Sequence, residues 1–177
     1  MKFGSSILLV IASLAVSLGA AAAAVLESRD WIGDIINQIG LGLVTDLNAY
    51  ITTQTLVDNK ISIDVNLKSP LIIELTIDRI VSSAGLNGTI YSTFDHTFEK
   101  PVVLPPQKKV NTGRIPDVLL TQGALASLDI IQYGIMDLYS TDVYVRALTI
   151  DGNLGVPITI KGLKQLAVPA NYTLELS

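Results

Sequence analysis

The stretch ISIDVNLKSPLIIELTIDRI, residues 61–80, is the most regular pattern in the chain and indicates its fold class. Its apolar side chains stand at odd-numbered positions with mostly polar side chains between them: Ile61, Ile63, Val65, Leu67, Leu71, Ile73, Leu75 and Ile77. A period of two is typical of a β-strand with one buried and one solvent-facing side. Pro70 interrupts the pattern without changing its phase, and proline cannot donate a ladder hydrogen bond. The stretch therefore predicts either one long strand with a kink or bulge at Pro70, or two strands that face the same core.

The first residues have the pattern of a secretory signal peptide. Lys2 precedes an apolar run at 7–16, and a series of alanines before residue 25 fits the small-x-small rule for cleavage. We expect cleavage near Ala22 to Ala24, which assigns residues 1–24 as signal peptide and predicts a secreted protein. The alternative is a membrane-anchored protein with an uncleaved segment, because residues 7–26 are about long enough to span a bilayer.

Composition narrows the classes of partner and chemistry. The 177 residues include 12 basic and 16 acidic side chains, for a net charge of −4, and the basic ones form no cluster. An acidic chain of this kind is not expected to bind nucleic acid, nor to be drawn strongly to anionic lipid. The sequence has no cysteine, so disulfides, thiol catalysis and zinc–thiolate sites are excluded.

Residues 25–50 are expected to form an N-terminal amphipathic helical segment. Apolar side chains recur every four residues from Trp31 to Leu47, which predicts a helix over about 28–47 whose regular part ends near Ile39, before Gly40. Such a helix either packs on the following domain or lies at a membrane interface. Its polar face carries Asp34, Asn37 and Gln38 rather than lysines, which favours packing on the domain.

Residues 51–177 are expected to form one β-domain with an inserted helix. Helical spacing over 124–139 predicts that helix, and the proline-rich segment 100–106 predicts a sheet edge or crossover. Strand patterns separated by turn signals occupy 50–57, 89–98, 108–120, 141–151, 156–163 and 172–176. Together with the N-terminal helix, these elements predict a mainly β fold, an antiparallel immunoglobulin- or fibronectin-like sandwich.

The order of these motifs resembles a known family. The alternating strand with its Ser69-Pro70 corner is followed by an NGT turn at 87–89, an LPPQKK stretch, a helix, and a final hairpin with the sequence IDGNLGVPITI. Over about 56–176 this order is similar to the group-2 late embryogenesis abundant proteins, also called the water-stress and hypersensitive-response domain, and especially to related fungal secreted proteins of unassigned function. The family's usual corner is Asn-Pro, where this chain has Ser69-Pro70. The resemblance implies a seven-stranded fibronectin-like sandwich, no catalytic residues, and an association with stress tolerance or membranes.

Few residues suggest catalysis or metal binding. His96 is the only histidine, and no nucleophile elbow accompanies it, so we expect a strand histidine rather than a catalytic one. Asp64, Glu74 and Asp78 are expected to be ordinary charges on the solvent face of the strand. The segment Asp151-Gly152-Asn153 resembles the start of a calcium loop but lacks the later ligands, so it predicts a hairpin turn.

Modification and groove formation are two further candidates. Asn87-Gly88-Thr89 and Asn171-Tyr172-Thr173 are acceptor tripeptides for N-glycosylation, which predicts glycans on Asn87 and Asn171 of a secreted eukaryotic protein. Four aromatic side chains could line a groove for lipid or sugar, although such spacings more often place aromatics in a core: Trp31, Tyr133, Tyr139 and Tyr144.

The sequence therefore predicts a non-enzymatic secreted module with a binding or stress-protective role. We expect no catalytic residue, no cofactor and no metal site; the ligand is left open, with cell-wall and lipid chemistry as the candidates. The alternative is a membrane-associated, lipid-contacting protein held by the helix at 28–47 or by an uncleaved segment at 7–26.

Overall fold

The computed structural model describes residues 42–175, which belong to one compact unit spanning Gln38–Ser177. The expected signal peptide at 1–24, the alternative anchor at 7–26 and most of the expected helical segment at 25–50 lie outside the described residues. The elements are β1 (Val44–Thr52), α2 (Thr55–Asp58), β2 (Lys60–Lys68), β3 (Leu75–Leu86), β4 (Thr89–Leu104), β5 (Lys109–Asn111), β6 (Ile115–Leu120), α3 (Ala124–Leu128), the 3-10 helix η1 (Ile131–Tyr133), β7 (Ile135–Ala147) and β8 (Val156–Glu175).

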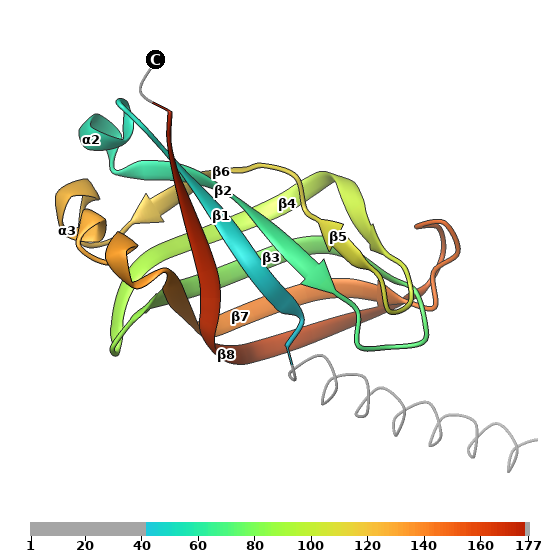
Figure 1. Cartoon of the computed structure of the whole chain (residues 1–177). Coiled ribbons are helices and arrows are strands. Elements are labelled where there is room, and N and C mark those ends of the chain that lie inside the picture. The colour runs from blue at the N-terminus through green and yellow to red at the C-terminus, as the bar shows by residue number, and fades with distance from the viewer. Residues whose placement is uncertain (1–41, 176–177) are drawn as a thin grey trace, which may run out of the picture. The chain divides into compact units, whose positions relative to one another are not determined.

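The strands form a closed barrel, so the prediction of an immunoglobulin-like sandwich is wrong. Hydrogen-bonded neighbours follow the order β1-β8-β7-β3-β4-β6-β2, and β1 also pairs with β2, which joins the two ends of the sheet (Figure 1). Among the strands of residues 42–175, only β5 lies outside this ring, and it pairs with β2. The prediction failed because alternating side chains are equally suited to the inner faces of a sandwich and to the interior of a barrel.

β1 closes the barrel through two kinds of pairing. It runs antiparallel to β2, with Asn48 opposite Asp64, and parallel to the end of β8, with Asn48 opposite Asn171. Leu47, Ala49 and Ile51 on its inner face are buried. The residues from Val44 to Leu47, expected to end a helix, are therefore strand, and the barrel begins inside the segment 25–50.

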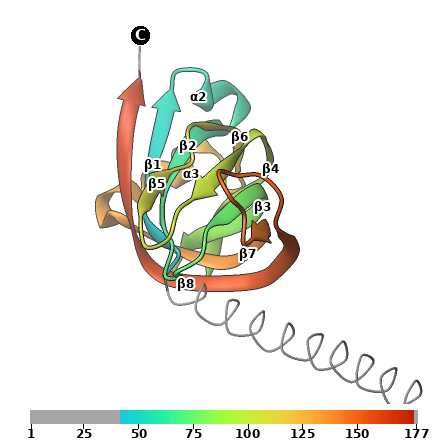
Figure 2. The same ribbon diagram turned by 90° about the vertical axis from the view of Figure 1, so that its right-hand side faces the viewer.

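β8 reaches β1 because it is long and strongly bent. Its residues 156–169 pair with β7 and its last residues, 170–175, pair with β1, and the strand curves around the barrel wall (Figure 2). The bend contains bulges at Gly162 and Ala167, both with positive φ. The backbone N–H of Gly162 donates to Asp142 at 2.8 Å, and that of Ala167 donates to Asp137 at 2.8 Å. These two carboxylates of β7 thus stabilise the bulges that bend β8.

The stretch 61–80 forms two strands that face the same core, the second of the two predicted alternatives. β2 ends at Lys68, and the corner is stabilised by Ser69, whose buried hydroxyl accepts a hydrogen bond from the N–H of Leu71 at 3.2 Å. β3 then crosses to the far side of the ring and pairs with β4 and β7. A bulge at Asp78 shifts the register, so the buried positions change from odd numbers to even ones after Ile77.

Two other predictions are resolved in the second half of the chain. The interrupted strand expected over 108–120 is confirmed as β5 and β6, and the hairpin expected over 141–163 is confirmed as β7 and the first half of β8. The helix expected over 124–139 is only partly correct: α3 and η1 are each about one turn long, and Gly134 in a left-handed conformation ends η1 before β7 begins at Ile135.

The pairing between β1 and β8, where the barrel closes, is called the closure seam. A disulfide across this seam can test barrel closure, because the chain has no native cysteine. Asn48 and Asn171 face each other on the outer surface, with the Asn171 amide donating to the Asn48 side chain at 3.1 Å. We expect the double variant Asn48→Cys, Asn171→Cys to form an intramolecular disulfide and to melt at a higher temperature when oxidised than when reduced, since the bond links residues 123 positions apart. Mass spectrometry of proteolytic fragments and a thermal melt measure both effects.

The control pair is Asn48→Cys with Thr97→Cys, because Thr97 is exposed on β4, which does not pair with β1. This pair should stay reduced or cross-link only between molecules. If the seam pair behaves in the same way, the β1–β8 pairing is wrong.

Candidate functional site

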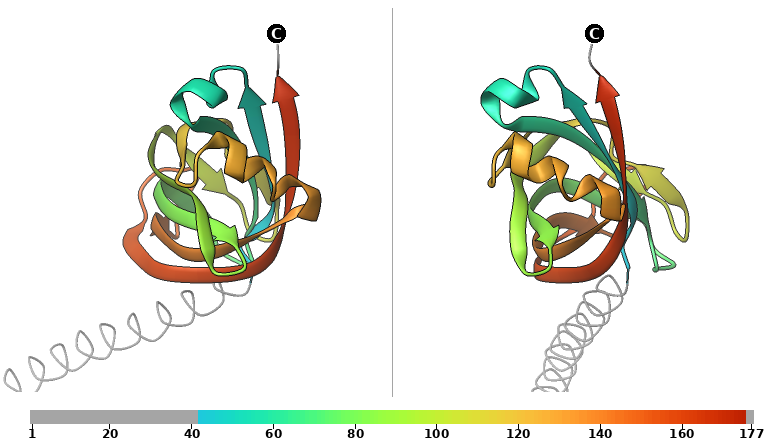
Figure 3. Two further views of the ribbon diagram at one scale, coloured as in Figure 1. Left: turned by 90° about the vertical axis from the view of Figure 1, so that its left-hand side faces the viewer. Right: turned by 60° about the vertical axis from the view of Figure 1, so that its left-hand side comes forward.

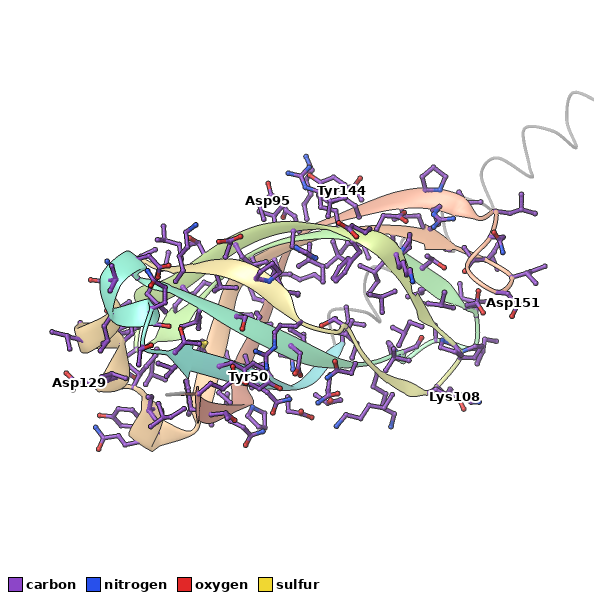
Figure 4. All side chains as sticks on the ribbon, turned by 90° about the horizontal axis from the view of Figure 1, so that it is seen from above. Tyr50, Asp95, Lys108, Asp129, Tyr144 and Asp151 are labelled. Atoms are coloured by element: carbon purple, nitrogen blue, oxygen red, sulfur yellow. The ribbon has the colours of Figure 1, made fainter. Side chains whose placement is uncertain are left out.

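Two short helices and η1 gather at one end of the barrel. α2 follows the end of β1. α3 contacts α2, and η1, which follows α3, contacts β8 (Figure 3). Asn59, directly after α2, ties the helices together, because its side-chain oxygen accepts the N–H of Ala124 at 2.8 Å. In Figure 4 this end, marked by Asp129, lies opposite the end marked by Asp151.

An apolar cavity of about 90 Å³ lies in the barrel interior at this end. The inner faces of several strands line it, with Ala49 from β1, Val65 from β2 and Ala84 from β3. α2 contributes Leu56 and α3 contributes Leu128. The cavity thus forms where small side chains on the strands leave space that the two helices only partly cover.

The polar groups in the cavity wall are mostly paired with each other or with backbone. The hydroxyls of Ser82 and Thr141 lie 2.7 Å apart, and the Ser127 hydroxyl donates to the Gly123 carbonyl at 2.8 Å. The phenol of Tyr172 differs, because its oxygen is buried and has no hydrogen-bond partner among the described residues. Burial raises the pKa of Tyr172, so the phenol stays protonated at neutral pH.

The rim of the cavity is apolar and reaches the surface. Leu56 and Leu128 both line the cavity, and their side chains are 56% and 38% exposed. Val57 on α2 and Leu125 on α3 are exposed next to them. Lys164, exposed on β8, is the cation that lines the cavity.

A second cluster of polar side chains covers the outer face of the closure seam. The carboxylate of Asp64 accepts hydrogen bonds from Asn48, Tyr50 and Asn111, drawn from β1 and β5. Asp46 accepts from Lys109 at 2.7 Å. Arg114 stacks on the Tyr50 ring at 3.7 Å and binds both carboxylate oxygens of Glu175. The cluster connects β8, β1, β2 and β5 on the outside of the barrel.

The electrostatics of this outer cluster indicate a structural role. Burial alone would raise the pKa of Asp64, but the hydrogen bonds from Tyr50, Asn48 and Asn111 outweigh it, and the net pKa is lowered. The hydrogen bond from Lys109 lowers the pKa of Asp46. Carboxylates held ionised by several donors are poor proton acceptors at neutral pH. Asp64 is only 9% exposed, so the expectation that it is an ordinary solvent-face charge is wrong.

The other two carboxylates considered in the sequence do not line the cavity, and they hold the backbone of the β7–β8 turn in place. Asp78 forms an ion pair with Arg146 at 2.9 Å, and Arg146 also donates to the carbonyls of Gly152 and Leu154. Glu74 accepts the N–H of Gly152 at 3.0 Å. Residues 151–155 are the turn between β7 and β8, as predicted. Within residues 42–175, no group of three or more His, Asp or Glu side chains is placed to hold a metal ion.

The aromatic residues proposed for a groove do not come together. Tyr133 is exposed on η1, the Tyr139 hydroxyl accepts the N–H of Gly88, and Arg79 lies over the Tyr144 ring. Figure 4 shows Tyr144 beside Asp95 on the outer surface. None of the three lines the cavity, and Trp31 lies outside the described residues.

Three further residues predicted from the sequence lie on the surface strands and turns. His96 lies on β4, with its ring edge against Phe98 at a centroid distance of 4.7 Å. The two proposed glycosylation sites are exposed, Asn87 in the β3–β4 turn and Asn171 on β8, and their use stays a prediction.

Sequence reasoning missed Tyr172 as a functional candidate. The sequence assigned it only to the last strand, where it alternates with Leu174. That alternation is no signal for an inward phenol, because Leu174 is 60% exposed.

Comparisons with known proteins identify no family for this chain. No family model matches it, and no curated protein matches it. A solved structure of a protein from Archaeoglobus fulgidus is 11% identical, the match covers 61% of this chain and 84% of that one, and the TM-score is 0.26, which is too low to support an argument. The resemblance to late embryogenesis abundant proteins therefore stays a prediction. Among residues 42–175, no helix is long and apolar enough to cross a membrane.

Asp64 should contribute strongly to stability through the seam. We expect Asp64→Ala to lower the free energy of unfolding by about 2–4 kcal/mol at neutral pH, because three donors lose a charged acceptor in a largely buried place. The pKa is lowered in the folded state, so this contribution is present above about pH 4 and is lost as the pH falls through the lowered pKa. Denaturant unfolding at several pH values measures it.

The control is Glu99→Ala, an exposed carboxylate on β4, which should change stability by less than about 0.5 kcal/mol. Equal effects of the two variants, or a difference that does not shrink in acid, would contradict the role assigned to Asp64.

Proposed function

We propose that this protein is a non-enzymatic secreted binding module whose barrel holds the alkyl part of a lipid-like ligand. The observation that carries the proposal is the apolar cavity under α2 and α3, with its apolar rim at the surface. Secretion rests on the signal-peptide pattern at 1–24 and on the two exposed acceptor asparagines, Asn87 and Asn171.

The energetics of the cavity support an apolar ligand. A void of this size in an apolar core costs about 2 kcal/mol, at roughly 24 cal/mol per Å³. An alkyl chain that fills the void recovers this free energy, and each methylene it buries adds about 0.8 kcal/mol. Small side chains at Ala49 and Ala84 maintain the space, where larger aliphatic residues would fill it.

The dimensions favour a single chain over a ring system. An engineered apolar cavity of about 150 Å³ binds benzene, and this cavity is smaller. A linear alkyl chain is thinner than a ring and can continue past Leu56 and Leu128 to the surface. The rim residues then cover the part of the chain that the cavity does not enclose.

A specific observation favours a second function, contact with a lipid surface. Leu56, Val57 and Leu125 are exposed apolar side chains on α2 and α3, two helices that contact each other and that both contribute to the cavity wall. Exposed apolar side chains that cluster on one face are typical of interaction surfaces. A barrel that takes up an alkyl chain from a membrane would present this end to the bilayer.

Filling the cavity should weaken ligand binding. We expect Ala84→Ile to reduce the affinity for 2-methyl-1-decene, an alkene that carries an octyl chain, by at least about tenfold, because the added atoms occupy the ligand's space. The variant should keep its fold, since part of the void is filled rather than created. Methyl NMR titration of the full chain measures binding.

Thr97→Ile provides the matched control, since it adds a similar branched side chain on the exposed face of β4. It should bind as the parent does. An Ala84→Ile protein that is folded and binds the alkene normally would rule out the cavity as the binding site.

Contact with lipid should depend on the exposed helix side chains. We expect Leu125→Asp to lower the fraction of protein that floats with neutral phosphatidylcholine vesicles, because the charge removes an apolar contact and is costly to insert. Thr97→Asp, which adds the same charge at an exposed position on β4, is the control and should change flotation little. Equal flotation of the parent and both variants, or none in any, would argue against this second function.

A further inference from the structure

The phenol of Tyr172 is an unusual group to find in the wall of an apolar cavity. Its oxygen is the one buried side-chain oxygen or nitrogen without a hydrogen-bond partner among residues 42–175. Leaving a hydroxyl of this kind unsatisfied costs roughly 1–3 kcal/mol. Phenylalanine would fill the same place on β8 without that cost, so packing alone does not explain a tyrosine here.

The surroundings of Tyr172 direct the phenol toward the barrel interior. Tyr172 lies opposite Ala49 in the parallel β1–β8 pairing, and Ala49 is buried and lines the same cavity. Ala170, two residues earlier, is also buried, so the inward positions of β8 continue to Tyr172. The small side chain of Ala49 leaves room next to the ring.

We propose that the cavity binds a neutral lipid whose carbonyl oxygen accepts a hydrogen bond from the Tyr172 hydroxyl. This inference rests on the proposed function and specifies its ligand class: an ester or ketone that carries alkyl groups on both sides of the carbonyl. The apolar wall accommodates the alkyl groups, and the carbonyl supplies the acceptor that the phenol lacks.

The chemistry of the wall favours a neutral carbonyl over a carboxylate. A fatty-acid anion would exchange its full hydration for one hydrogen bond in an apolar space, which is strongly unfavourable. Lys164 is exposed at the rim and is solvated there. The raised pKa of Tyr172 keeps the phenol as a donor, which suits an acceptor such as a carbonyl.

The experiment compares three probes on the full chain: methyl octyl ketone, the isosteric alkene in which a CH₂ group replaces the carbonyl oxygen, and the nonanoate anion. We expect the parent protein to bind the ketone about tenfold more tightly than the alkene, and nonanoate more weakly than the ketone. In Tyr172→Phe the preference for the ketone over the alkene should disappear, while alkene binding is kept. The variant retains the acceptor pattern at Asn171 and Thr173, so glycosylation is not altered.

Tyr91→Phe is the matched control, because Tyr91 also lines the cavity and its oxygen is not among the buried unpartnered ones. It should keep the ketone preference. The thermal melt adds a second readout: Tyr172→Phe without ligand should melt at the same temperature as the parent or higher, whereas a phenol with a purely structural role would make it melt lower.

The outcomes separate the two proposals. If neither ketone nor alkene binds, the proposed function fails. If both bind equally, if the preference survives in Tyr172→Phe, or if nonanoate binds most tightly, the alkyl-binding function stands and the role of Tyr172 is refuted.

Discussion

The barrel depends on β1 pairing along both of its edges. An isolated sheet of this kind would have two edges with unpaired backbone groups, and β1 removes them by bonding to β2 on one side and to β8 on the other. Few residues form the pairing that closes the barrel, because the parallel β1–β8 register extends only from Leu47 to Thr52. The remaining architecture serves to bring the end of β8 to this place.

Two sets of side chains make the closure possible, one at the bend and one at the seam. Asp137 and Asp142 bind the backbone N–H groups of the bulges in β8, which allows the strand to leave β7 and turn toward β1. The hydrogen-bonded cluster around Asp64 then joins the strands on the outer face of the seam. The inner face of the seam is left to small and apolar residues, and it is there that Ala49 and Tyr172 face the cavity.

The function proposed for the barrel follows from the same closure. A sandwich with two flat layers can fill its interior by side-chain interdigitation, whereas a ring of strands encloses a space that must be filled from within or capped at its ends. At the α2–α3 end the capping helices are short, and their leucines lie partly over the cavity and partly at the surface. This arrangement gives an apolar ligand both a space and a route to it.

The sequence by itself determined the strand character of 61–80, the interruption near Pro70, the two-part strand over 108–120 and the final hairpin, because these depend on local alternation and turn residues. It also assigned Tyr172 to the last strand, although it did not indicate that the phenol oxygen is buried.

Only the tertiary structure decided that the sheet closes, that Val44–Leu47 is strand rather than helix, and that Ile135–Tyr139 belongs to β7. Those segments have helical spacing as well as β-compatible residues, and pairing with distant strands provides the hydrogen bonds that settle the choice. The cavity and the unpaired phenol could not be inferred from local sequence patterns either, because both arise where residues from opposite ends of the domain meet.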